Sequence, residues 1–410
     1  MLYTLVLWLS TDFGYDDRSA AGWVTVFSSC ATLFMLAAGF VGDALGLRRG
    51  LIGGFGLLAV GRLLMGIASG RAAAITGLMI MCVGYAISAP VLNTAFRRFS
   101  HPRARAFAFS TYFVVNNVGA TAAGFVVDAC RKGFLSADGS TLLSKTVHLP
   151  VLGDRVLSAY RVVFLVGAVL AGVGFLLTLL VRGDVDTEPV ADRSVQPGPP
   201  WRIAAEVARE AAFWRFMLLM TLLVFVKMIY QHGHFTLPKY AIRELGESFP
   251  IGRFQTINPI AIIVLVPLFT ALTRHLAPFR VIWVGSLVSA ASVFVLVLPA
   301  SYGTIAAFYL LLSVGEALWS PRTYELIATI APRGRESSYM GLSGLPFFVA
   351  KLGALPMSGW LLAKYCPPEG PRHSSMMWLV IGITTALAPI SMLALRPILE
   401  QPPGDGPERP

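Results

Sequence analysis

Long apolar stretches follow one another along almost the whole chain, and short polar connections separate most of them. A helix needs roughly 20 apolar residues to cross the hydrocarbon core of a bilayer, which is about 30 Å thick. The pattern predicts spanning helices at about 21–43, 51–69, 72–95, 107–128, 160–181, 215–238, 255–273, 280–300, 302–326, 339–363 and 376–396. It therefore indicates an all-α integral membrane protein.

The chain opens on a shorter apolar stretch, MLYTLVLWLS. Ten helical residues span about 15 Å, half of the hydrocarbon core. No basic region precedes the stretch and no small-residue cleavage site follows it, as a signal peptide would require. We therefore expect a first spanning helix that is cut off at its N-terminal end, through a truncated gene model or a mis-chosen start codon. With it, the expected number of spans is twelve.

Two connections are long. Arg131–Ala159 contains Asp138-Gly139 and Pro150 and predicts an exposed loop. The second, at 182–200, is rich in Asp, Pro and Gly and predicts a flexible cytoplasmic linker, followed by a surface helix at Trp201–Ala212. The expected domains are an N-terminal helical half, the linker with its surface helix, a C-terminal helical half and a disordered tail, at 1–181, 182–214, 215–400 and 401–410.

Composition agrees with a membrane protein. Hydrophobic residues make up 55% of the chain and charged residues 13%, against about a quarter charged in soluble proteins. The net charge of +11 does not indicate nucleic-acid binding, because the arginines lie in short loops between apolar stretches, where they orient spanning helices. The arginine-rich side should be cytoplasmic, with both termini on it, and the plasma (inner) membrane is the expected location.

The two halves contain a repeat. GYAISAP at 84–90 aligns with GEALWSP at 315–321, and Arg-x-Arg follows each at nearly the same distance, at 103–105 and 333–335. Transporters are commonly built from such repeats, with the substrate site between them near the midplane. In this frame, Tyr85 is the counterpart of Glu316. Chance similarity between two helices that contain Gly and Pro is the alternative.

A glycine-rich motif follows the second predicted span, GFVGDALGLRR at 39–49. It resembles the signature loop between helices two and three of the major facilitator superfamily, and with twelve spans and a central linker the resemblance covers essentially the whole chain. The resemblance implies two six-helix bundles and a conformational latch formed by Gly39, Gly42, Asp43, Gly46, Arg48 and Arg49. For Asp43, a simple helix cap is the alternative.

Two further stretches resemble the proton-dependent oligopeptide transporters. AFAFSTYFVVNNVGA at 106–120 is similar to that family's fifth helix, with matches at Tyr112, Phe113, Asn117 and Gly119. GEALWSP with the following Ala331-Pro332 is similar to its tenth helix. The resemblance implies that Glu316 faces a central cavity and helps to bind the amino group of a peptide, and that Asn117 is a further site residue.

The chain also departs from that family. The helix-one motif of two acids and an Arg would lie before Met1, and the Lys that often precedes the fourth-helix Pro is Ala89 here. The usual proton-coupled peptide mechanism therefore does not carry over residue by residue. The chain is either a divergent relative or a member of a neighbouring major facilitator family with another substrate.

Three ionisable residues converge on a similar depth in the membrane. Glu316 lies about 21 Å along its predicted span, and Lys227 and Lys351 lie about 18 Å along theirs. One polar stripe on the seventh span should face protein or water, since it would be costly in lipid: Lys227, Tyr230, Gln231 and His234. The alternative is a buried ion pair of Glu316 with Lys227 or Lys351. The two interpretations are compatible if binding of substrate or protons opens this ion pair.

Other polar residues in the spans have simpler interpretations. Arg62 should bind a backbone carbonyl or an Asp rather than substrate. Arg322 and Glu325 lie at i and i+3, so a local salt bridge or a gate is expected. Pro321 removes one helix hydrogen bond and should kink the helix just past Glu316, which adds it to the gate. The four cysteines have no metal-like spacing, and a disulfide among them stays open: Cys30, Cys82, Cys130 and Cys366.

Motifs for phosphate binding, zinc proteases and serine nucleophiles do not occur in the sequence. We therefore expect no enzyme, no cofactor, no metal and no nucleic-acid partner. The sequence predicts a monomeric secondary active transporter of a small polar or charged solute, working by alternating access and driven by protons. A cavity with one acid and two lysines fits peptides, amino acids, organic anions or drugs. The alternative is a degenerate, non-transporting receptor or sensor of the same fold. The substrate itself is not readable from the residues.

Overall fold

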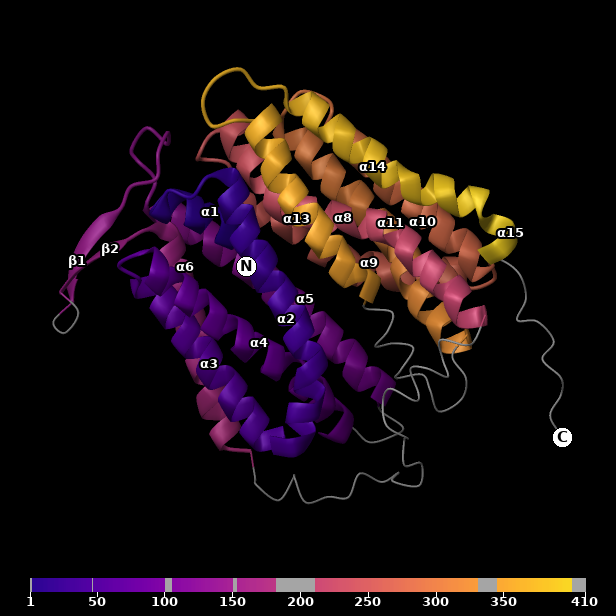
Figure 1. The fold of residues 1–410 in the computed structure, drawn as a ribbon, viewed down its shortest axis with the longest axis horizontal. Helices are drawn as coiled ribbons and strands as arrows, with labels where there is room; N and C mark the ends of the chain where they lie inside the picture. Colours follow the sequence, from indigo (N-terminus) through magenta and orange to yellow (C-terminus); the bar gives the residue numbers. More distant parts are fainter. Residues whose placement is uncertain are drawn as a thin grey trace. The chain divides into compact units, whose positions relative to one another are not determined.

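The computed structural model describes residues 2–45, 47–99, 105–149, 153–181, 211–330 and 345–399 (Figure 1). Helices make up nearly all of this part of the chain. The predicted linker at 182–200, most of the predicted surface helix that follows it and the predicted tail at 401–410 lie outside the described residues.

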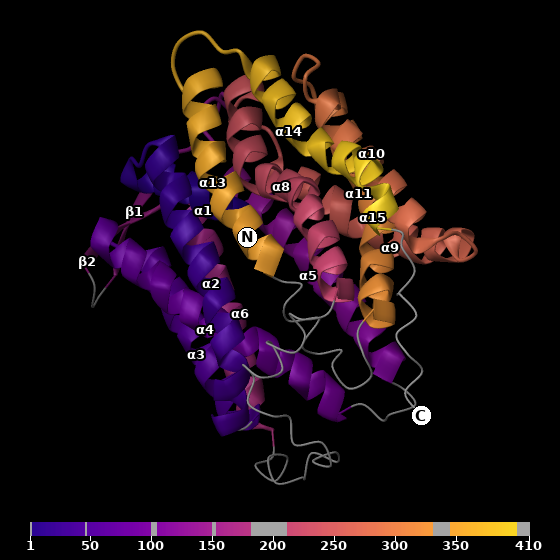
Figure 2. The same cartoon turned by 45° about the vertical axis from the view of Figure 1, so that its right-hand side comes forward.

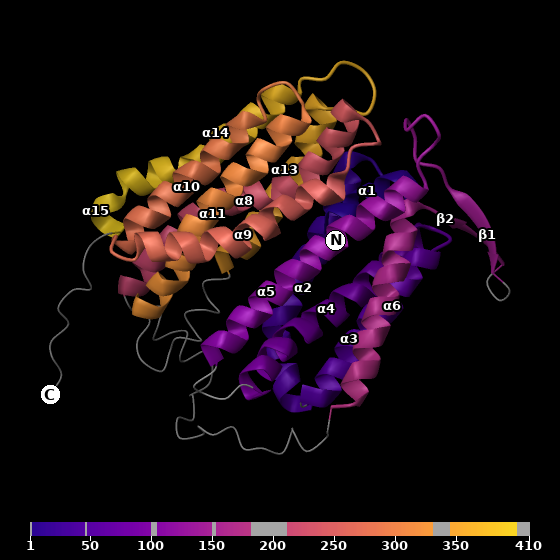
Figure 3. The ribbon, with the colours of Figure 1, turned by 180° about the vertical axis from the view of Figure 1, so that it is seen from behind.

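The first half of the chain forms helices with short connections. Their bounds are α1 Leu2–Phe13, α2 Asp17–Leu45, α3 Leu47–Ile67, α4 Arg71–Phe99, α5 Arg105–Gly133 and α6 Ala159–Leu179. The α3 helix packs against both α4 and α6, and α2 packs against α4 (Figure 3). Trp8 of α1 is completely buried with its ring edge-to-face against Phe164 of α6. The first helix is therefore integrated into the packed core.

The second half of the chain is also built from helices. Its helices are α8 Ala211–Leu245, α9 Ile251–Thr273, α10 Pro278–Val295, α11 Tyr302–Ile330, α13 Leu345–Tyr365, α14 Ser374–Ala394 and α15 Arg396–Leu399. The α10 helix packs against both α11 and α14 (Figure 2). Five of these helices contain internal prolines, in agreement with the tolerance for proline in membrane helices.

Eight of the described helices are long and apolar enough to cross a membrane: α3, α4, α6, α8, α9, α10, α11 and α14. The other four predicted spans correspond to α1, α2, α5 and α13. Large apolar side chains are exposed on α6 and at its C-terminal cap, including Val169, Leu170, Leu176, Leu177 and Leu180. Such a surface would be unusual in water but suits lipid. The protein is a multi-pass integral membrane protein.

The residues group into two compact units. The first unit contains 1–190, 235–256 and 355–363, and the second contains 191–234, 257–354 and 364–410. Both α8 and α13 contribute one part of their length to each unit. The later part of α8 and the beginning of α9 thus belong with the N-terminal helices.

The repeat is visible in the packing inside each unit. A Cβ added at Gly84 of α4 would lie 2.6 Å from the Leu58 nitrogen on α3, and one at Gly315 of α11 would lie 2.6 Å from the Ser289 nitrogen on α10. Both glycines therefore permit the same close approach of two helix backbones. Equivalent packing at these equivalent positions supports a true repeat over chance similarity.

The long connection after α5 is not simply an exposed loop as predicted. It contains an antiparallel hairpin, β1 Lys145–Leu149 with β2 Gly153–Leu157, that projects away from α6 (Figure 3). The predicted turn at Asp138-Gly139 is present, since Gly139 has a φ of +72°. Hydrogen bonds from Ser136 and Ser140 lower the pKa of the Asp138 carboxyl to about 2. The prediction missed the strands because the alternation is only five residues long.

The glycine-rich motif was expected to form a loop between the second and third spans. In the structure, α2 continues to Leu45, two residues past the predicted span at 21–43, and α3 begins at Leu47, so Gly39, Gly42 and Asp43 lie in a helix. The intervening residues are apolar, and in lipid a helix is the way to satisfy their backbone groups. Gly46 and the side chain of Asp43 lie outside the described residues. Arg48 donates from Nη2 to the Leu179 carbonyl at 3.4 Å, and Arg49 is exposed.

Candidate functional site

The polar stripe on α8 faces protein, as expected. The Lys227 ammonium lies over the Trp319 ring of α11, 4.6 Å from its centroid, and 5.4 Å from the centroid of the Tyr230 ring. Such cation–π contacts partly replace the hydration that an ammonium loses inside a protein. Trp319 was missed as a site residue. Its spacing of i+3 from Glu316, on the same face of α11, was the available signal.

Glu316 has a partner that the sequence did not predict. Its Oε2 accepts a hydrogen bond from Asn258 Nδ2 of α9 at 2.9 Å. The same Nδ2 lies 3.1 Å from the Ser313 hydroxyl, which donates to the Tyr309 carbonyl at 2.7 Å. A fixed amide donor therefore orients this carboxylate. The sequence analysis did not consider Asn258 as a site residue, although an Asn within a spanning helix was a usable signal.

Three of the predicted site residues carry ionisable side chains that interact electrostatically. Glu316 and Lys227 interact electrostatically, and so do Lys227 and Lys351. That these three ionisable side chains form one substrate site stays a prediction. Gln231 and His234 lie on the same helix and are half-buried. Their contribution to a substrate site stays a prediction.

Two hydrogen-bond donors in this cluster make no hydrogen bond of good geometry with the described residues. They are the Tyr230 hydroxyl and the Trp319 indole nitrogen, Nε1, both shielded from solvent. The Tyr230 hydroxyl nevertheless interacts with both Glu316 and Trp319. Buried polar groups are normally satisfied, so each exception calls for an explanation.

The predicted site residues of the N-terminal half belong to the other compact unit. Tyr85 of α4 is 49% exposed, and Asn117 of α5 is half-buried. Their membership in one site with Glu316 therefore stays a prediction. The side chains of Tyr112 and Phe113 lie outside the described residues.

Two arginines are tied to neighbouring helices. Arg62 donates from Nη1 to the Gly167 carbonyl at 2.9 Å, which confirms the predicted structural role. Arg322 is buried and donates from Nη2 to the Thr273 hydroxyl of α9 at 3.2 Å. The side chain of its predicted partner, Glu325, lies outside the described residues. The helix continues through Pro321.

The first unit contains a buried network that the sequence pattern did not predict. Asp17 of α2 accepts hydrogen bonds from Lys239 Nζ at 2.7 Å and from both terminal nitrogens of Arg243 at 2.8 and 2.9 Å. Lys239 also donates to the Ser10 hydroxyl at 2.6 Å. Both cations lie on α8, far from Asp17 in sequence, so helical periodicity could not pair them. The network joins α2 to α8.

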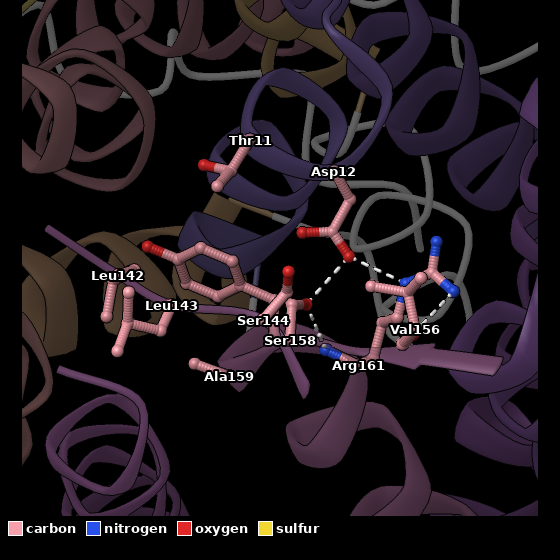
Figure 4. Close-up of a pocket in the computed structure, with 10 residues that line it drawn as sticks. Thr11, Asp12, Leu142, Leu143, Ser144, Val156, Ser158, Ala159 and Arg161 are labelled. Carbon is pink, nitrogen blue, oxygen red and sulfur yellow. Dashed lines mark hydrogen bonds and ion pairs between the residues drawn. The ribbon is translucent and has the colours of Figure 1, made fainter. Parts of the chain in front are cut away.

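A second network borders a pocket of about 190 Å³ (Figure 4). There, Asp12 Oδ2 accepts from Arg161 Nε at 2.8 Å and from the Ser158 hydroxyl at 2.7 Å, and Arg161 Nη1 donates to the Val156 carbonyl at 2.9 Å. Ser158 caps α6 at its N-terminus. These contacts hold α1, β2 and α6 together, so the pair has a structural explanation.

Arg131 was predicted to begin an exposed loop, and this prediction is wrong. It is a buried residue of α5 that donates to the Glu247 carboxylate at 2.8 Å and to the Phe249 carbonyl at 2.6 Å. On the same helix, Asp128 accepts from the Gly252 and Arg253 amides at 2.7 and 2.8 Å. A carboxylate at the beginning of α9 satisfies free amides there. All four cysteines are free.

The helical repeat, the apolar spans and an acid held in the middle of one span define a membrane carrier built from two related halves. The family model of the Major Facilitator Superfamily matches residues 1–350. The chain belongs to this family. The prediction of a carrier fold rather than an enzyme is thereby confirmed.

Curated relatives carry transporter names. The chain is 26% identical over 220 residues to dipeptide and tripeptide permease A of Cronobacter turicensis, which covers 47% of this chain and 43% of the permease. The match thus spans less than half of that relative's length. It is 24% identical over 376 residues to multidrug resistance protein MdtH of Aeromonas hydrophila, covering 89% of this chain and 83% of the relative.

Solved structures show the same fold. A peptide transporter of the POT family superposes with a TM-score of 0.75 at 17% identity, covering 97% of this chain and 91% of that one. A POT family transporter in complex with 5-aminolevulinic acid gives a TM-score of 0.75 at 14% identity, covering 98% and 93%. The major facilitator fold and the distant similarity to oligopeptide transporters are therefore confirmed.

Proposed function

We propose that this protein is a secondary active transporter that moves a small polar or charged solute by alternating access of its two helical halves. Membership in the Major Facilitator Superfamily and the paired packing of Gly84 and Gly315 support this proposal. Curated relatives are named as dipeptide and tripeptide permeases and as a multidrug resistance protein. A peptide-like or amino-acid-like solute agrees with the first of these names.

The observation that carries the proposal is the Glu316 carboxylate, held by Asn258 in the middle of a spanning helix. An acid at that depth is costly unless it has a function or a partner. We assign to it the binding of a proton or of the substrate's amino group. Lys227 and Lys351 would pair with it or bind an anionic group. The remaining contacts would come from Asn117, Tyr230, Gln231, His234 and Tyr85.

Proton coupling follows from the same arrangement. A carboxylate with one hydrogen bond and a cation nearby can exchange that cation for a proton or a substrate amine, and such an exchange couples binding to a conformational change. We further propose that the glycine-rich segment acts as the latch and Pro321, Arg322 and Glu325 as the gate. The expected arrangement is a monomer in the plasma (inner) membrane with cytoplasmic termini.

Transport in proteoliposomes tests this function. Purified protein is reconstituted with an imposed pH gradient, and uptake is measured for labelled di-alanine, tri-alanine and 5-aminolevulinic acid. The wild type should concentrate at least one of these solutes in response to the gradient. Glu316→Gln should abolish gradient-driven uptake, because the amide cannot carry a proton, while the exposed control Glu369→Gln should not.

Two results would count against the proposal. Intact gradient-driven uptake by Glu316→Gln would remove the role of Glu316. Saturable binding of these solutes by wild-type protein without any uptake would instead identify a receptor of the same fold. Detergent-solubilised thermal unfolding of both variants confirms that they are folded.

A further inference from the structure

One face of α5 contacts the beginning of α9. Gly124, Asp128 and Arg131 follow one another at the spacing of a helix face. Asp128 accepts hydrogen bonds from the Gly252 and Arg253 amides at 2.7 and 2.8 Å. A side chain added at Gly124 would collide with the Gly252 carbonyl, and one added at Gly252 would collide with the Gly124 carbonyl. The two backbones therefore touch at this point, and an acid of α5 caps the first turn of α9.

Arg131 makes a second contact one turn further along α5. Its Nη1 donates to the Phe249 carbonyl at 2.6 Å, and its Nη2 donates to the carbonyl and to the carboxylate of Glu247, both at 2.8 Å. These acceptors lie in the turn between α8 and α9, and the partners of Asp128 lie at a helix end. Water can replace each of these hydrogen bonds when the segments separate. We call Asp128 and Arg131 with these partners the α5 lock.

Two helices pass from one compact unit to the other beside a proline. The boundary in α8 falls between residues 234 and 235, and the boundary in α13 falls between residues 354 and 355. Because proline has no amide hydrogen, Pro238 of α8 leaves the His234 carbonyl without its helix hydrogen bond, and Pro356 of α13 does the same to the Leu352 carbonyl. Helices bend most easily where such a bond is missing. Each helix therefore contains a bending point at its boundary.

Further contacts hold the segments beyond these boundaries. Lys239 of α8 pairs with Asp17 of α2 at 2.7 Å, and a Cβ added at Gly359 of α13 would lie 2.7 Å from the Asp17 carbonyl oxygen. Thr236 and Ser358 join the ends of α8 and α13 through a hydrogen bond of 2.6 Å. Successive spans cross in alternate directions, so all these helix ends lie on the membrane side opposite the predicted linker. Opening this end must break the contacts of α2 as well as the α5 lock.

We propose that residues 235–256 and 355–363 form a hinged gate on the membrane side opposite the linker, and that the α5 lock holds this gate closed. The inference rests on the proposed function, because alternating access needs an entrance that opens on each side in turn. When the lock is released, the segments turn about Pro238 and Pro356 away from the N-terminal helices. The strength of the lock thereby sets the fraction of molecules in which this entrance is open.

Distances between spin labels test the gate. The full chain, with its four native cysteines replaced by serine, is labelled at Ser19→Cys and Ser248→Cys and placed in lipid nanodiscs. Both side chains are exposed, the first on α2 and the second in the turn between α8 and α9. Double electron–electron resonance measures the ratio of open to closed molecules, and the shorter distance should predominate. Labels at Ser19→Cys and Lys132→Cys, both on N-terminal helices, form the control pair, whose distance should not change.

Variants of the lock should open the gate. Asp128→Asn and Arg131→Gln each remove a charged hydrogen-bonding group and should raise the open-to-closed ratio about ten- to hundredfold. Gly252→Ala should raise the ratio without changing a charge, because its methyl group collides with the α5 backbone. Asp138→Asn is the matched control and should leave the ratio unchanged, because this exposed acid bonds to serines of its own turn.

Variants of the bending points should have the opposite effect. Pro238→Ala and Pro356→Ala restore a backbone donor at the boundary, so the open-to-closed ratio should fall about three- to tenfold and uptake should slow. Pro267→Ala is the control, because this proline lies in an exposed part of α9 away from both boundaries.

The gate is overturned if Asp128→Asn, Arg131→Gln and Gly252→Ala all keep the label distances of the chain without these substitutions. It is also overturned if the control pair lengthens as much as the gate pair, because the lock would then hold the N-terminal helices to one another. The expected distance changes without any uptake under a pH gradient defeat the proposed transport but leave the gate standing. Gradient-driven uptake with unchanged distances leaves transport standing and defeats the gate.

Discussion

Buried carboxylates have different hydrogen-bond partners in the two compact units. In the first unit, the carboxylate of Asp17 receives hydrogen bonds from Lys239 and Arg243, and that of Asp12 receives them from Arg161 and Ser158. In the second unit, Glu316 accepts from Asn258, a neutral amide, and the nearby donors of Tyr230 and Trp319 make no hydrogen bond of good geometry with the residues that the structure describes. Saturated pairs hold helices in place, whereas incomplete ones leave room for a ligand. The α8 helix carries both kinds.

The saturated network predicts the largest effect on stability. Asp17→Asn would leave Lys239 and Arg243 buried without their counter-charge and should lower the free energy of unfolding by about 3–5 kcal/mol. Thermal and denaturant unfolding in detergent measure it. Asp16→Asn, its exposed neighbour, should change stability by less than about 0.5 kcal/mol. Equal effects of the two variants would show that the network does not stabilise the fold.

The repeat predicts the next largest effect, and it should be similar in both units. Gly84→Ala and Gly315→Ala each place a methyl group against the backbone of the neighbouring helix. Each should lower the free energy of unfolding by about 1–3 kcal/mol, as overpacking does. Gly119→Ala is the control, because a Cβ there meets nothing within 4 Å. A tolerated alanine at only one of the two repeat positions would break the structural equivalence of the halves.

The incomplete network should respond in function more than in stability. Asn258→Ala removes the donor to Glu316 and should cost about 1 kcal/mol or less of stability, since the carboxylate has other electrostatic partners. Uptake should fall about tenfold, because the acid loses its orientation. Initial rates in proteoliposomes and melting temperatures on the same preparation separate the two. A large loss of stability with normal uptake per folded molecule would place Glu316 among the structural pairs.

We expect the smallest effect on stability at Asp138, an exposed acid in the turn that follows α5. The pKa of Asp138 is lowered to about 2 by hydrogen bonds from Ser136 and Ser140, against about 3.9 in an unfolded chain. Its contribution to the turn is therefore complete above the unfolded pKa and is lost as the pH falls towards 2. Hydrogen exchange of the Gly139 and Ser140 amides between pH 2 and 6 should show this opening. Asp138→Asn should remove the pH dependence and leave uptake unchanged.

Much of the fold could be predicted from the order of residues because lipid imposes a simple local rule. Each span appears near its expected place, from α2 to α14, since about 20 apolar residues must form a helix there. The exceptions are short segments. The five-residue strands of the hairpin and the continuation of α2 to Leu45 depend on contacts with neighbouring segments, which the periodicity of the sequence does not reveal.

The sequence by itself also determined which ionisable residues lie deep in the membrane, because position along a helix of known rise sets depth. It predicted a similar depth for Glu316, Lys227 and Lys351 on this basis. Only the tertiary structure decided the partners: Asn258 for Glu316, Trp319 for Lys227 and two cations of α8 for Asp17. These partners are distant in sequence, and a hydrogen bond depends on distance and direction between atoms, which the packing of whole helices establishes.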